Sequence, residues 1–551
     1  MNIKKHLLKG LFLALCVCFT LPSVAQNLEQ EINAFMTKEY TAETPGFSLL
    51  VAKNGQTIYK SGFGMANLEV GVPAAPKHVF EIGSITKQFT AVAILMLEEQ
   101  GKLGLQDPIT KFIPEYPTQG KTITVHQLLN HTSGIKSYTN MASFMTLART
   151  DMTPTELIDK FKNEEMEFDP GTAFNYNNSG YILLGHIIEV VSGESYADFI
   201  QTKIFDKVGM EHSYYGSMPL LIPNRASGYS ETENGYRNAN YLSLTLPYAA
   251  GSIMSTTEDL LKWQNAISAN SLIKRSSLDK AVNGSTLKTG EKIPYGYGWI
   301  DGNINGSKTT EHSGGIFGYS TNGIYLPEED VYVIGLSNCD CGDVQAIVSN
   351  VAAMAIGKPY PKKEDAIALN TSQLSKWVGA YEYEGGVVRH ITIEGKQLWS
   401  QREGSTNLEI YPMTATNFIF DGGDTSYEFY MENGKRMTKM TANGNTMVGT
   451  GIDKAPPAER VSITLSPMTL SEYIGTFELQ PGFNLAISVR DGQIFALATG
   501  QGELELFASE KDKFFTKAIA AEVHFTRNAN GAVESLTLLQ GGQQMPGKKI
   551  E

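Results

Sequence analysis

The chain has 551 residues, a formal net charge of −13 at pH 7, 42% hydrophobic residues and 19% charged residues. This composition excludes a disordered, collagen-like or disulfide-scaffold protein, because those classes are poor in apolar residues, built on Gly repeats or dense in cysteine. The acidic chain also has no stripe of lysine and arginine, so nucleic acid is not an expected partner. The length allows three or four domains with substantial cores.

Residues 1–25 have the pattern of a signal peptide. Positively charged lysines precede an apolar stretch, 11–21, that is too short to cross a bilayer as an ordinary helix. The small residues at 23–25 predict cleavage before Gln26. We therefore expect an exported protein, periplasmic or secreted, with no membrane span in the mature chain; a retained N-terminal anchor is the alternative.

Residues 26–358 mix helical runs with short strands, which is typical of an α/β or α+β domain. The run 89–97 is apolar nearly all round and predicts a buried helix that Gly101 ends. Ser84 stands at the start of this helix, and Lys87 follows one turn later on the same face. A serine hydroxyl needs a base to become a nucleophile, and a lysine in an apolar environment loses its charge more easily. Ser-x-x-Lys occurs five times in the chain, but only this copy opens an apolar helix.

The segment 171–185 places Tyr176 and Asn178 immediately before a second apolar helix. We predict that Asn178 or Ser179 caps that helix. A loop pinned by a helix start is a good position for catalytic side chains. The alternative is a capping loop that only packs a tyrosine.

A third segment, with His312, Gly314 and Gly315, precedes two strand-like runs. It predicts a strand edge that presents a polar side chain and approachable backbone N–H groups, or else a purely structural hairpin. Beyond it, Cys339 and Cys341 are expected to be unpaired small residues at a strand end. Cysteines two positions apart rarely bond to each other, and two ligands do not make a zinc site.

The C-terminal part of the chain repeats itself. After a Pro- and charge-rich joint at 357–364, short alternating segments with Gly, Asn and Asp turns replace helical periodicity. An offset of 96 relates the two halves of this region and pairs, for example, Trp399 with Phe495. We predict two lipocalin-like antiparallel β-barrels, at residues 371–455 and 463–551. The sequence leaves three roles open for these barrels: they are ligand-binding domains, docking modules or spacers.

Three motifs occur in the order known from one family: Ser84-x-x-Lys87, Tyr176-x-Asn178 and His312-x-Gly314. Together they resemble the serine β-lactamase and penicillin-binding (DD-peptidase) superfamily, in its class C-like branch. The resemblance covers about residues 30–355. It implies an α/β (α+β) domain in which helices flank an antiparallel sheet and a helical subdomain is added.

The resemblance implies that Ser84 is the acylated nucleophile and that Lys87 and Tyr176 share the role of base. Lys87 and His312 are then expected to lower each other's pKa, and the neighbouring tyrosine is expected to ionise more readily.

The resemblance also implies a substrate-binding set. Asn178 holds the substrate amide or the lysine, and the oxyanion hole consists of the backbone N–H groups of Ser84 and Gly315. His312, followed by Gly314, stands where most members carry the lysine of Lys-Thr-Gly. The literal Lys288-Thr-Gly of this chain precedes that position in a polar turn, and we interpret it as unrelated. A fixed positive charge for a β-lactam or peptide carboxylate is then missing or pH-dependent, which argues against efficient β-lactamase activity.

The function predicted from these residues is that of an exported serine hydrolase with an acyl-enzyme at Ser84. Its substrate would be a small molecule or short peptide, first a peptide with D-amino acids and second an ester, without a cofactor or metal. Some D-aminopeptidase relatives share two C-terminal barrels, which favours a peptidase by analogy. The alternatives are an acyltransferase with an apolar acceptor pocket lined by the aromatic stretch 236–248, a weak β-lactamase or DD-carboxypeptidase, and a non-catalytic ligand-binding protein.

Overall fold

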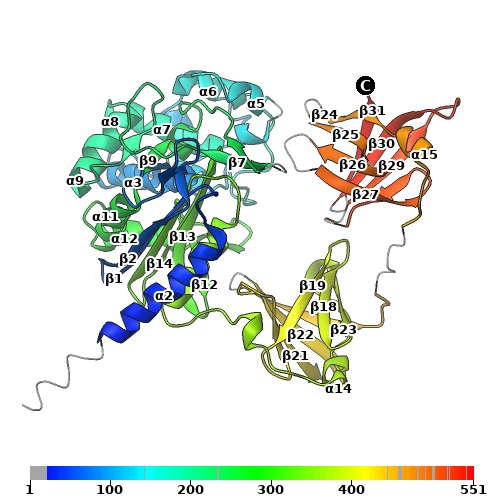
Figure 1. The fold of residues 1–551 in the computed structure, drawn as a ribbon. Coiled ribbons are helices and arrows are strands. Elements are labelled where there is room, and N and C mark those ends of the chain that lie inside the picture. The colour runs from blue at the N-terminus through cyan, green and yellow to red at the C-terminus, as the bar shows by residue number, and fades with distance from the viewer. Residues whose placement is uncertain are drawn as a thin grey trace, which may run out of the picture. The chain divides into compact units, whose positions relative to one another are not determined.

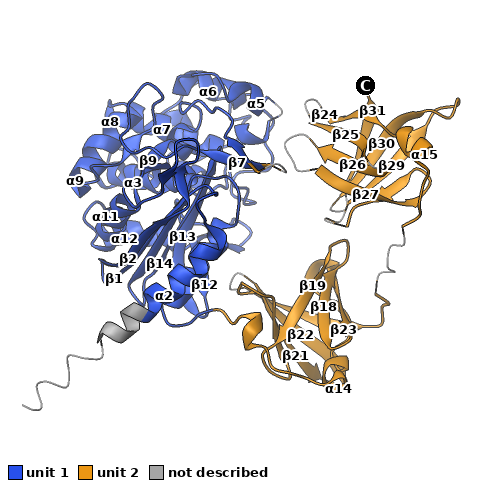
Figure 2. Cartoon of the chain, viewed as in Figure 1, with its two compact units in different colours: residues 1–231, 236–359 blue, residues 232–235, 360–551 orange. Residues whose placement is uncertain are grey.

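The computed structural model describes residues 21–141, 143–232, 235–442, 445–456, 462–480, 483–490, 492–498, 503–517, 519, 521–540 and 543–550. It has two compact units, residues 1–231 with 236–359 and residues 232–235 with 360–551 (Figure 2). Most of the predicted signal peptide, residues 1–20, lies outside the described residues. Helix α2 (Leu21–Glu39) runs through the predicted cleavage position. Within the described part of the chain, no helix is both long and apolar enough to cross a membrane.

The first unit is built on a six-stranded antiparallel sheet with the order β12-β13-β14-β15-β1-β2 (Figure 1). Helices α11 (Thr257–Ser268) and α13 (Val344–Ala355) pack against β15, and every residue of that strand is buried. Strand β1, the first of the sheet in sequence, pairs with β15, the last, inside the sheet. The six strands are β1 (Phe47–Lys53), β2 (Gln56–Phe63), β12 (Ile300–Ile304), β13 (Ser307–Ile316), β14 (Tyr319–Leu326) and β15 (Val331–Ser337).

The helical part of this unit is centred on α3 (Thr86–Glu99), which packs against α7 (Asn178–Ser192) and α10 (Tyr248–Gly251). Every residue of α3 from 86 to 97 is buried, and Gly101 follows the helix at φ +69°, as the apolar run predicts. Since full burial of one leucine or isoleucine side chain contributes about 1.5–3 kcal/mol, this helix is a principal part of the core. The predicted fold class is confirmed.

Shorter elements complete the first unit. The helices are α4 (Val125–Leu129), α5 (Phe144–Leu147), α6 (Pro154–Phe161), α8 (Tyr196–Ile200), α9 (Asp206–Val208) and α12 (Arg275–Val282), with the 3₁₀ turns η1 (Gly83–Ile85) and η3 (Tyr138–Asn140). The short strands are β3 (Met65–Asn67), β4 (Val72–Pro73), β5 (Phe80–Glu81), β6 (Tyr214–Tyr215), β7 (Tyr229–Thr232), β8 (Gly235–Asn238), β9 (Ile253–Ser255), β10 (Ser285–Thr286) and β11 (Lys292–Ile293).

Two closed antiparallel barrels make up the second unit, as the internal repeat predicts. Short helices, α14 (Thr371–Ser375) and α15 (Pro467–Ser471), precede them. The first barrel consists of β16 (Gly379–Glu382), β17 (Val388–Glu394), β18 (Gln397–Arg402), β19 (Asn407–Pro412), β20 (Asn417–Ile419), β21 (Ser426–Glu432), β22 (Lys435–Ala442) and β23 (Asn445–Ile452). The second consists of β24 (Gly475–Gln480), β25 (Phe483–Arg490), β26 (Gln493–Ala498), β27 (Glu503–Glu510), β28 (Lys513–Phe515), β29 (Ala521–Arg527), β30 (Val533–Gln540) and β31 (Gln543–Lys549).

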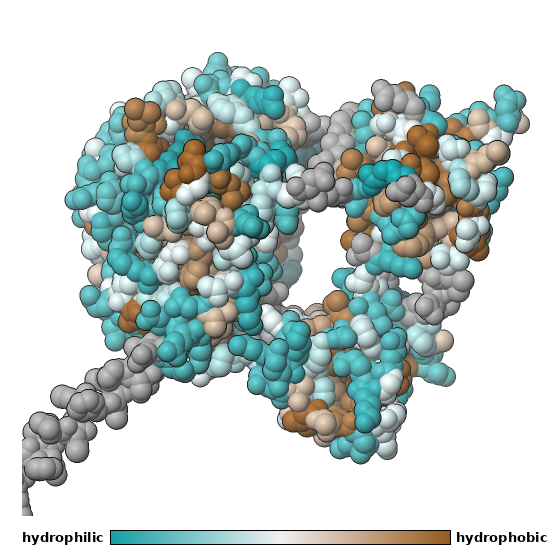
Figure 3. Space-filling model, viewed as in Figure 1, coloured by the Kyte–Doolittle hydropathy of each residue, from teal (hydrophilic) through white to brown (hydrophobic). Residues whose placement is uncertain are grey.

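Each barrel has its own aromatic core, in which alternate residues of the strands point inward. Trp377 and Phe429 stack in the first barrel, and Tyr473 and Phe525 contact each other in the second. On the face drawn in Figure 3, hydrophilic side chains cover most of the first unit and apolar ones form separate patches.

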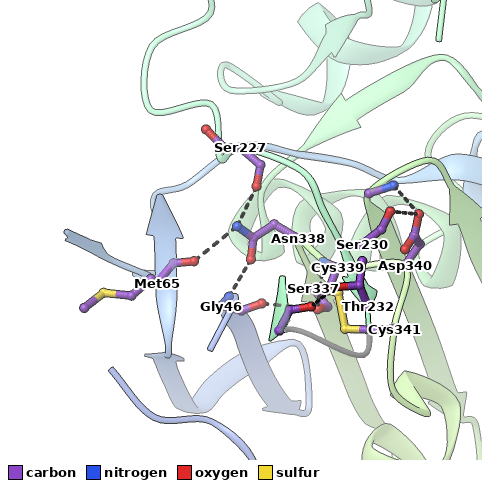
Figure 4. Close-up of a disulfide and its surroundings, with 12 residues drawn as sticks. Gly46, Met65, Ser227, Ser230, Thr232, Ser337, Asn338, Cys339, Asp340 and Cys341 are labelled. Atoms are coloured by element: carbon purple, nitrogen blue, oxygen red, sulfur yellow. Dashed lines mark hydrogen bonds between the residues drawn. A yellow bond between two sulfur atoms is a disulfide. The ribbon is translucent and has the colours of Figure 1, made fainter. Parts of the chain in front are cut away.

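The prediction that Cys339 and Cys341 stay unpaired is wrong, because the two form a disulfide (Figure 4). The chain bends after β15, and the Cα atoms come to 5.0 Å of each other, closer than the roughly 6.6 Å of an extended pair two residues apart. Backbone hydrogen bonds with Tyr229 hold this bend, since Tyr229 donates to Asn338 and accepts from Asp340. The sequence prediction assumed an extended strand end and so missed the bond.

Candidate active site

Ser84 lies in the turn η1, immediately before α3 and against β13. The preceding Gly83 has φ +51°, and a Cβ atom at this position would lie 3.0 Å from the backbone nitrogen of Gly315. A glycine is therefore needed for the turn to approach the strand this closely. The close approach brings η1, and with it Ser84, next to the backbone of Gly315.

The amine of Lys87 is completely buried and lies between three oxygen atoms. Its Nζ is 3.0 Å from Ser84 Oγ, 2.8 Å from Asn178 Oδ1 and 2.9 Å from the carbonyl oxygen of Ala250. Burial lowers the pKa of Lys87 well below its ordinary value, because a charged amine loses its hydration there. Within the described part of the chain, no carboxylate forms an ion pair with Lys87.

The neighbours of Lys87 orient its lone pair. A neutral amine has two N–H donors and one lone pair, and the carbonyl of Ala250 can only accept a hydrogen bond. Asn178 donates through Nδ2 to Thr139 Oγ1 (3.1 Å), so its Oδ1 also faces Lys87 as an acceptor. In the neutral form of Lys87 both N–H groups are thereby used, and the lone pair is left for the hydroxyl proton of Ser84. Sequence reasoning assigned no role to Ala250 or Thr139. Ala250 lies in the segment 249–259, which resembles the same family, whereas Thr139 belongs to no recognised motif.

Tyr176 is partly buried at this site, with its hydroxyl shielded from solvent, and its ring centroid lies 4.9 Å from Lys87 Nζ. Among the described residues its hydroxyl has no hydrogen-bond partner, although Ser84 is close enough to lower the pKa of the phenol slightly. Burial raises that pKa by more, so the expectation that Tyr176 ionises readily is wrong. The reason is that the phenolate loses its hydration in the protein interior.

His312 lies on β13 as predicted, but both of its ring nitrogens are used inside the protein. Nδ1 is 2.6 Å from the carbonyl oxygen of Ser313, which only accepts, so the proton is on Nδ1. Nε2 accepts from the hydroxyl of Tyr295 at 2.9 Å. Burial, with a smaller effect from Lys87, lowers the pKa of His312 to about 3. The imidazole is therefore neutral at pH 7 and does not replace the strand lysine as a fixed cation for substrate.

A layer of aromatic rings supports these groups. His131 is buried, accepts from the backbone N–H of Asn177 through Nδ1 at 3.1 Å, and has its ring centroid 4.4 Å from that of Tyr176. Asn177, and not Asn178 or Ser179, caps α7 by accepting from Gly180 N–H at 2.8 Å. The cap lies one residue earlier than predicted because the side chain of Asn178 turns to Lys87 instead.

A cavity of about 400 Å³ opens over Ser84. Lys87, Tyr176 and His312 are not among its described lining residues and lie behind its wall. The predicted stretch 236–248 contributes aliphatic residues but none of its tyrosines, because β8 leaves Tyr236 exposed and α10 buries Tyr248. Lys288 stands outside the lining, in the turn between β10 and β11. The lining includes Ser84, Asn178, Gly315, Asp340, Tyr138, Phe144, Leu242, Leu246, Pro247, Phe317 and Tyr319.

Residues 26–356 match the family model described as Beta-lactamase. The chain belongs to the β-lactamase family. It is a serine hydrolase by fold and family, and its active-site motifs lie within the matched region. Residues 459–549, which contain the second barrel, match a model described as Domain of unknown function (DUF3471).

Relatives of this β-lactamase family member include penicillin-binding proteins and amidohydrolases. Penicillin-binding protein 4* of Bacillus subtilis (strain 168) is 33% identical over 404 residues, which are 69% of this chain and 89% of that protein. The octameric penicillin-binding protein homologue of Pyrococcus abyssi has a TM-score of 0.53 and 28% identity, covering 77% of this chain and 99% of that one. A D-stereospecific amidohydrolase of a Streptomyces species has a TM-score of 0.50 and 25% identity, covering 61% and 98%.

Proposed function

We propose that this protein is an exported serine hydrolase that forms an acyl-enzyme at Ser84 with amide or ester substrates, first of all short peptides containing D-amino acids. The observation that carries the proposal is the orientation of Lys87. In the neutral amine the two N–H groups face two obligate acceptors, so the lone pair faces the serine hydroxyl at 3.0 Å.

The proposed reaction starts when Lys87 takes the proton of Ser84 as Oγ attacks the substrate carbonyl carbon. The backbone N–H groups of Ser84 and Gly315 stabilise the oxyanion, and removal of one such donor raises the barrier by about 3 kcal/mol. Tyr176, kept protonated by burial, donates its proton to the leaving group and regains one from the protonated lysine. Water then attacks the ester at Ser84, the same groups move the proton in reverse, and the acid is released.

The cavity supports the choice of substrate. Its lining is mostly apolar and aromatic and takes an apolar side chain beside Ser84. The D-stereospecific amidohydrolase named above has the same fold, which supports a D-amino-acid substrate. Burial lowers the pKa of both His312 and Lys87, and this argues against a fixed positive charge for the carboxylate of a β-lactam. The Cys339–Cys341 disulfide supports export, since disulfides persist in oxidising compartments.

Intact-protein mass spectrometry tests the acyl-enzyme. The wild-type protein is incubated with D-peptide esters, their L-counterparts and a β-lactam, and a mass increase at Ser84 is expected for the D-esters. Ser84→Ala should abolish that adduct. Ser285→Ala removes the hydroxyl of another Ser-x-x-Lys in this chain and should leave the adduct unchanged. Equal labelling of Ser84→Ala at the same site would contradict the assignment.

Acyl transfer to an alcohol or amine is a second candidate, favoured by the aliphatic wall of Leu242, Leu246 and Pro247. Such a wall excludes water and favours an apolar acceptor. Product analysis with added alcohols decides between the two. A hydrolysis product alone would count against transfer.

A further inference from the structure

We propose that Asp340 gives this site a preference for substrates that carry a protonated amine, either a free amino terminus or a lysine-like side chain. This inference rests on the proposed function and adds to it a recognition element away from the reacting atoms. Asp340 is exposed and lines the same cavity as Ser84.

The carboxylate of Asp340 is held in place by the protein. Its Oδ2 accepts from the backbone N–H of Gly318 and from the hydroxyl of Ser230, each at 2.9 Å (Figure 4). The disulfide between Cys339 and Cys341 closes a small ring around the residue, and its own N–H donates to Tyr229. Both hydrogen bonds use one oxygen. In the described part of the chain, Oδ1 has no hydrogen-bond partner and Asp340 has no ion pair. A fixed carboxylate with a free oxygen is a preorganised acceptor for a cation.

The charges around the cavity also favour a positively charged substrate. Asp340 is the one acidic or basic side chain among the described lining residues. Behind the wall, burial lowers the pKa of Lys87 and that of His312. The cavity is therefore negative overall, so it repels a substrate carboxylate and attracts an ammonium group.

The short chain between Gly315 and Gly318 limits the distance between the carboxylate of Asp340 and the proposed oxyanion donor. Gly318, which binds the carboxylate, follows Gly315 by three residues, and three extended residues span at most about 10 Å. With the hydrogen bond added, the carboxylate of Asp340 lies within about 13 Å of the Gly315 nitrogen, the proposed oxyanion donor. A di- or tripeptide covers such a distance, so the amine belongs to a neighbouring residue or to a side chain of the substrate.

Steady-state kinetics with matched substrates tests this proposal. The substrates are D-peptide p-nitroanilides of one to three residues with a free amino terminus, the same peptides N-acetylated, and N-acetyl peptides that contain D-lysine. In the wild-type protein the amine substrates should have kcat/KM about tenfold above their neutral counterparts. Asp340→Asn keeps an acceptor oxygen for Gly318 and should remove that preference, measured as the ratio of kcat/KM for the amine peptide to kcat/KM for its neutral counterpart. Comparison of the free-terminus peptides with the N-acetyl D-lysine peptides shows which amine the protein recognises.

A matched control and a second readout separate the possible failures. Glu328→Gln removes one exposed negative charge at the far end of β14 and should leave the preference intact. An unchanged preference in Asp340→Asn would overturn the inference alone, provided that Ser84 is still acylated by neutral esters. Absence of acylation with every substrate would overturn both the inference and the proposed function.

Discussion

One pair of buried hydroxyls in the first barrel and the buried amine of the first unit are in different hydrogen-bonding states. In the barrel, the hydroxyls of Ser400 and Tyr427 lie 2.7 Å apart and satisfy each other. At the candidate active site, Lys87 is satisfied on two sides and directs its lone pair to Ser84, which lines a cavity. A paired polar group supports the fold, whereas a buried amine kept neutral costs stability and stays reactive.

The second barrel shows that the pairing inside the first is not needed for the architecture. The repeat offset places Ala496 and Val523 at the positions of Ser400 and Tyr427, and the barrel still closes. The active-site arrangement has no such substitute, because its function depends on one amine next to one hydroxyl. Four variants test this contrast.

Loss of the base is expected to have the largest effect. Lys87→Ala should lower kcat/KM for a D-peptide p-nitroanilide by about a thousandfold, because Ser84 then lacks a proton acceptor. Lys136→Ala alters another Ser-x-x-Lys and should stay within a few fold of wild type. If the first variant kept more than a tenth of the activity, Lys87 would not be the base.

The pH profile should move when a charge is added at Asn178. Lys87 acts in its neutral form, so kcat/KM should rise with pH through a lowered lysine pKa, well below the ordinary 10.5. Asn178→Asp places a carboxylate beside Nζ and stabilises the protonated amine, so the rising limb moves to higher pH. At a pH below the rising limbs of both proteins, the activity should fall about tenfold for every pH unit by which the limb moves. Asn178→Ser, which adds no charge, should not move the limb upward; an identical limb in all three proteins would contradict this interpretation.

Stability should change in the opposite direction to activity at Lys87. Lys87→Met removes a buried amine and should raise the free energy of unfolding of this unit by about 1–2 kcal/mol while abolishing turnover. Because burial lowers the folded-state pKa, the unfolded chain binds more protons between that pKa and 10.5. Wild-type stability should therefore rise with pH across this window, and the methionine variant should lack that slope. Urea denaturation at several pH values measures the free energy of unfolding and its slope with pH. Equal slopes in the wild-type and methionine proteins would exclude a neutral buried lysine.

The smallest effect is expected in the first barrel. Tyr427→Phe leaves the hydroxyl of Ser400 unpaired and should destabilise the barrel by about 1 kcal/mol without changing kcat/KM. Hydrogen exchange in β18 and β21 reports this locally. The double variant with Ser400→Ala should lose less than the sum of the two single changes, and full additivity would mean that the pair contributes nothing.

Local patterns predicted much of this molecule. The apolar run after Ser84, the spacing to Lys87 and the constant repeat offset each depend on residues near in sequence or on self-similarity, and the helix α3 and both barrels follow them. The prediction that Cys339 and Cys341 are unpaired failed because the disulfide depends on a bend of the chain. Tyr229, more than a hundred residues away, holds that bend.

By itself, the sequence determined which groups are available for chemistry: a serine and a lysine one turn apart, a distant tyrosine and asparagine, and a His-x-Gly strand. Only the tertiary structure decided their states. Burial lowers the pKa of Lys87 and raises that of Tyr176, and the hydroxyl of Tyr295 occupies the ring nitrogen of His312. It also placed Asp340 on the cavity wall. The physical reason is that protonation and hydrogen-bond direction depend on hydration and on partners brought together from distant segments, which no local pattern records.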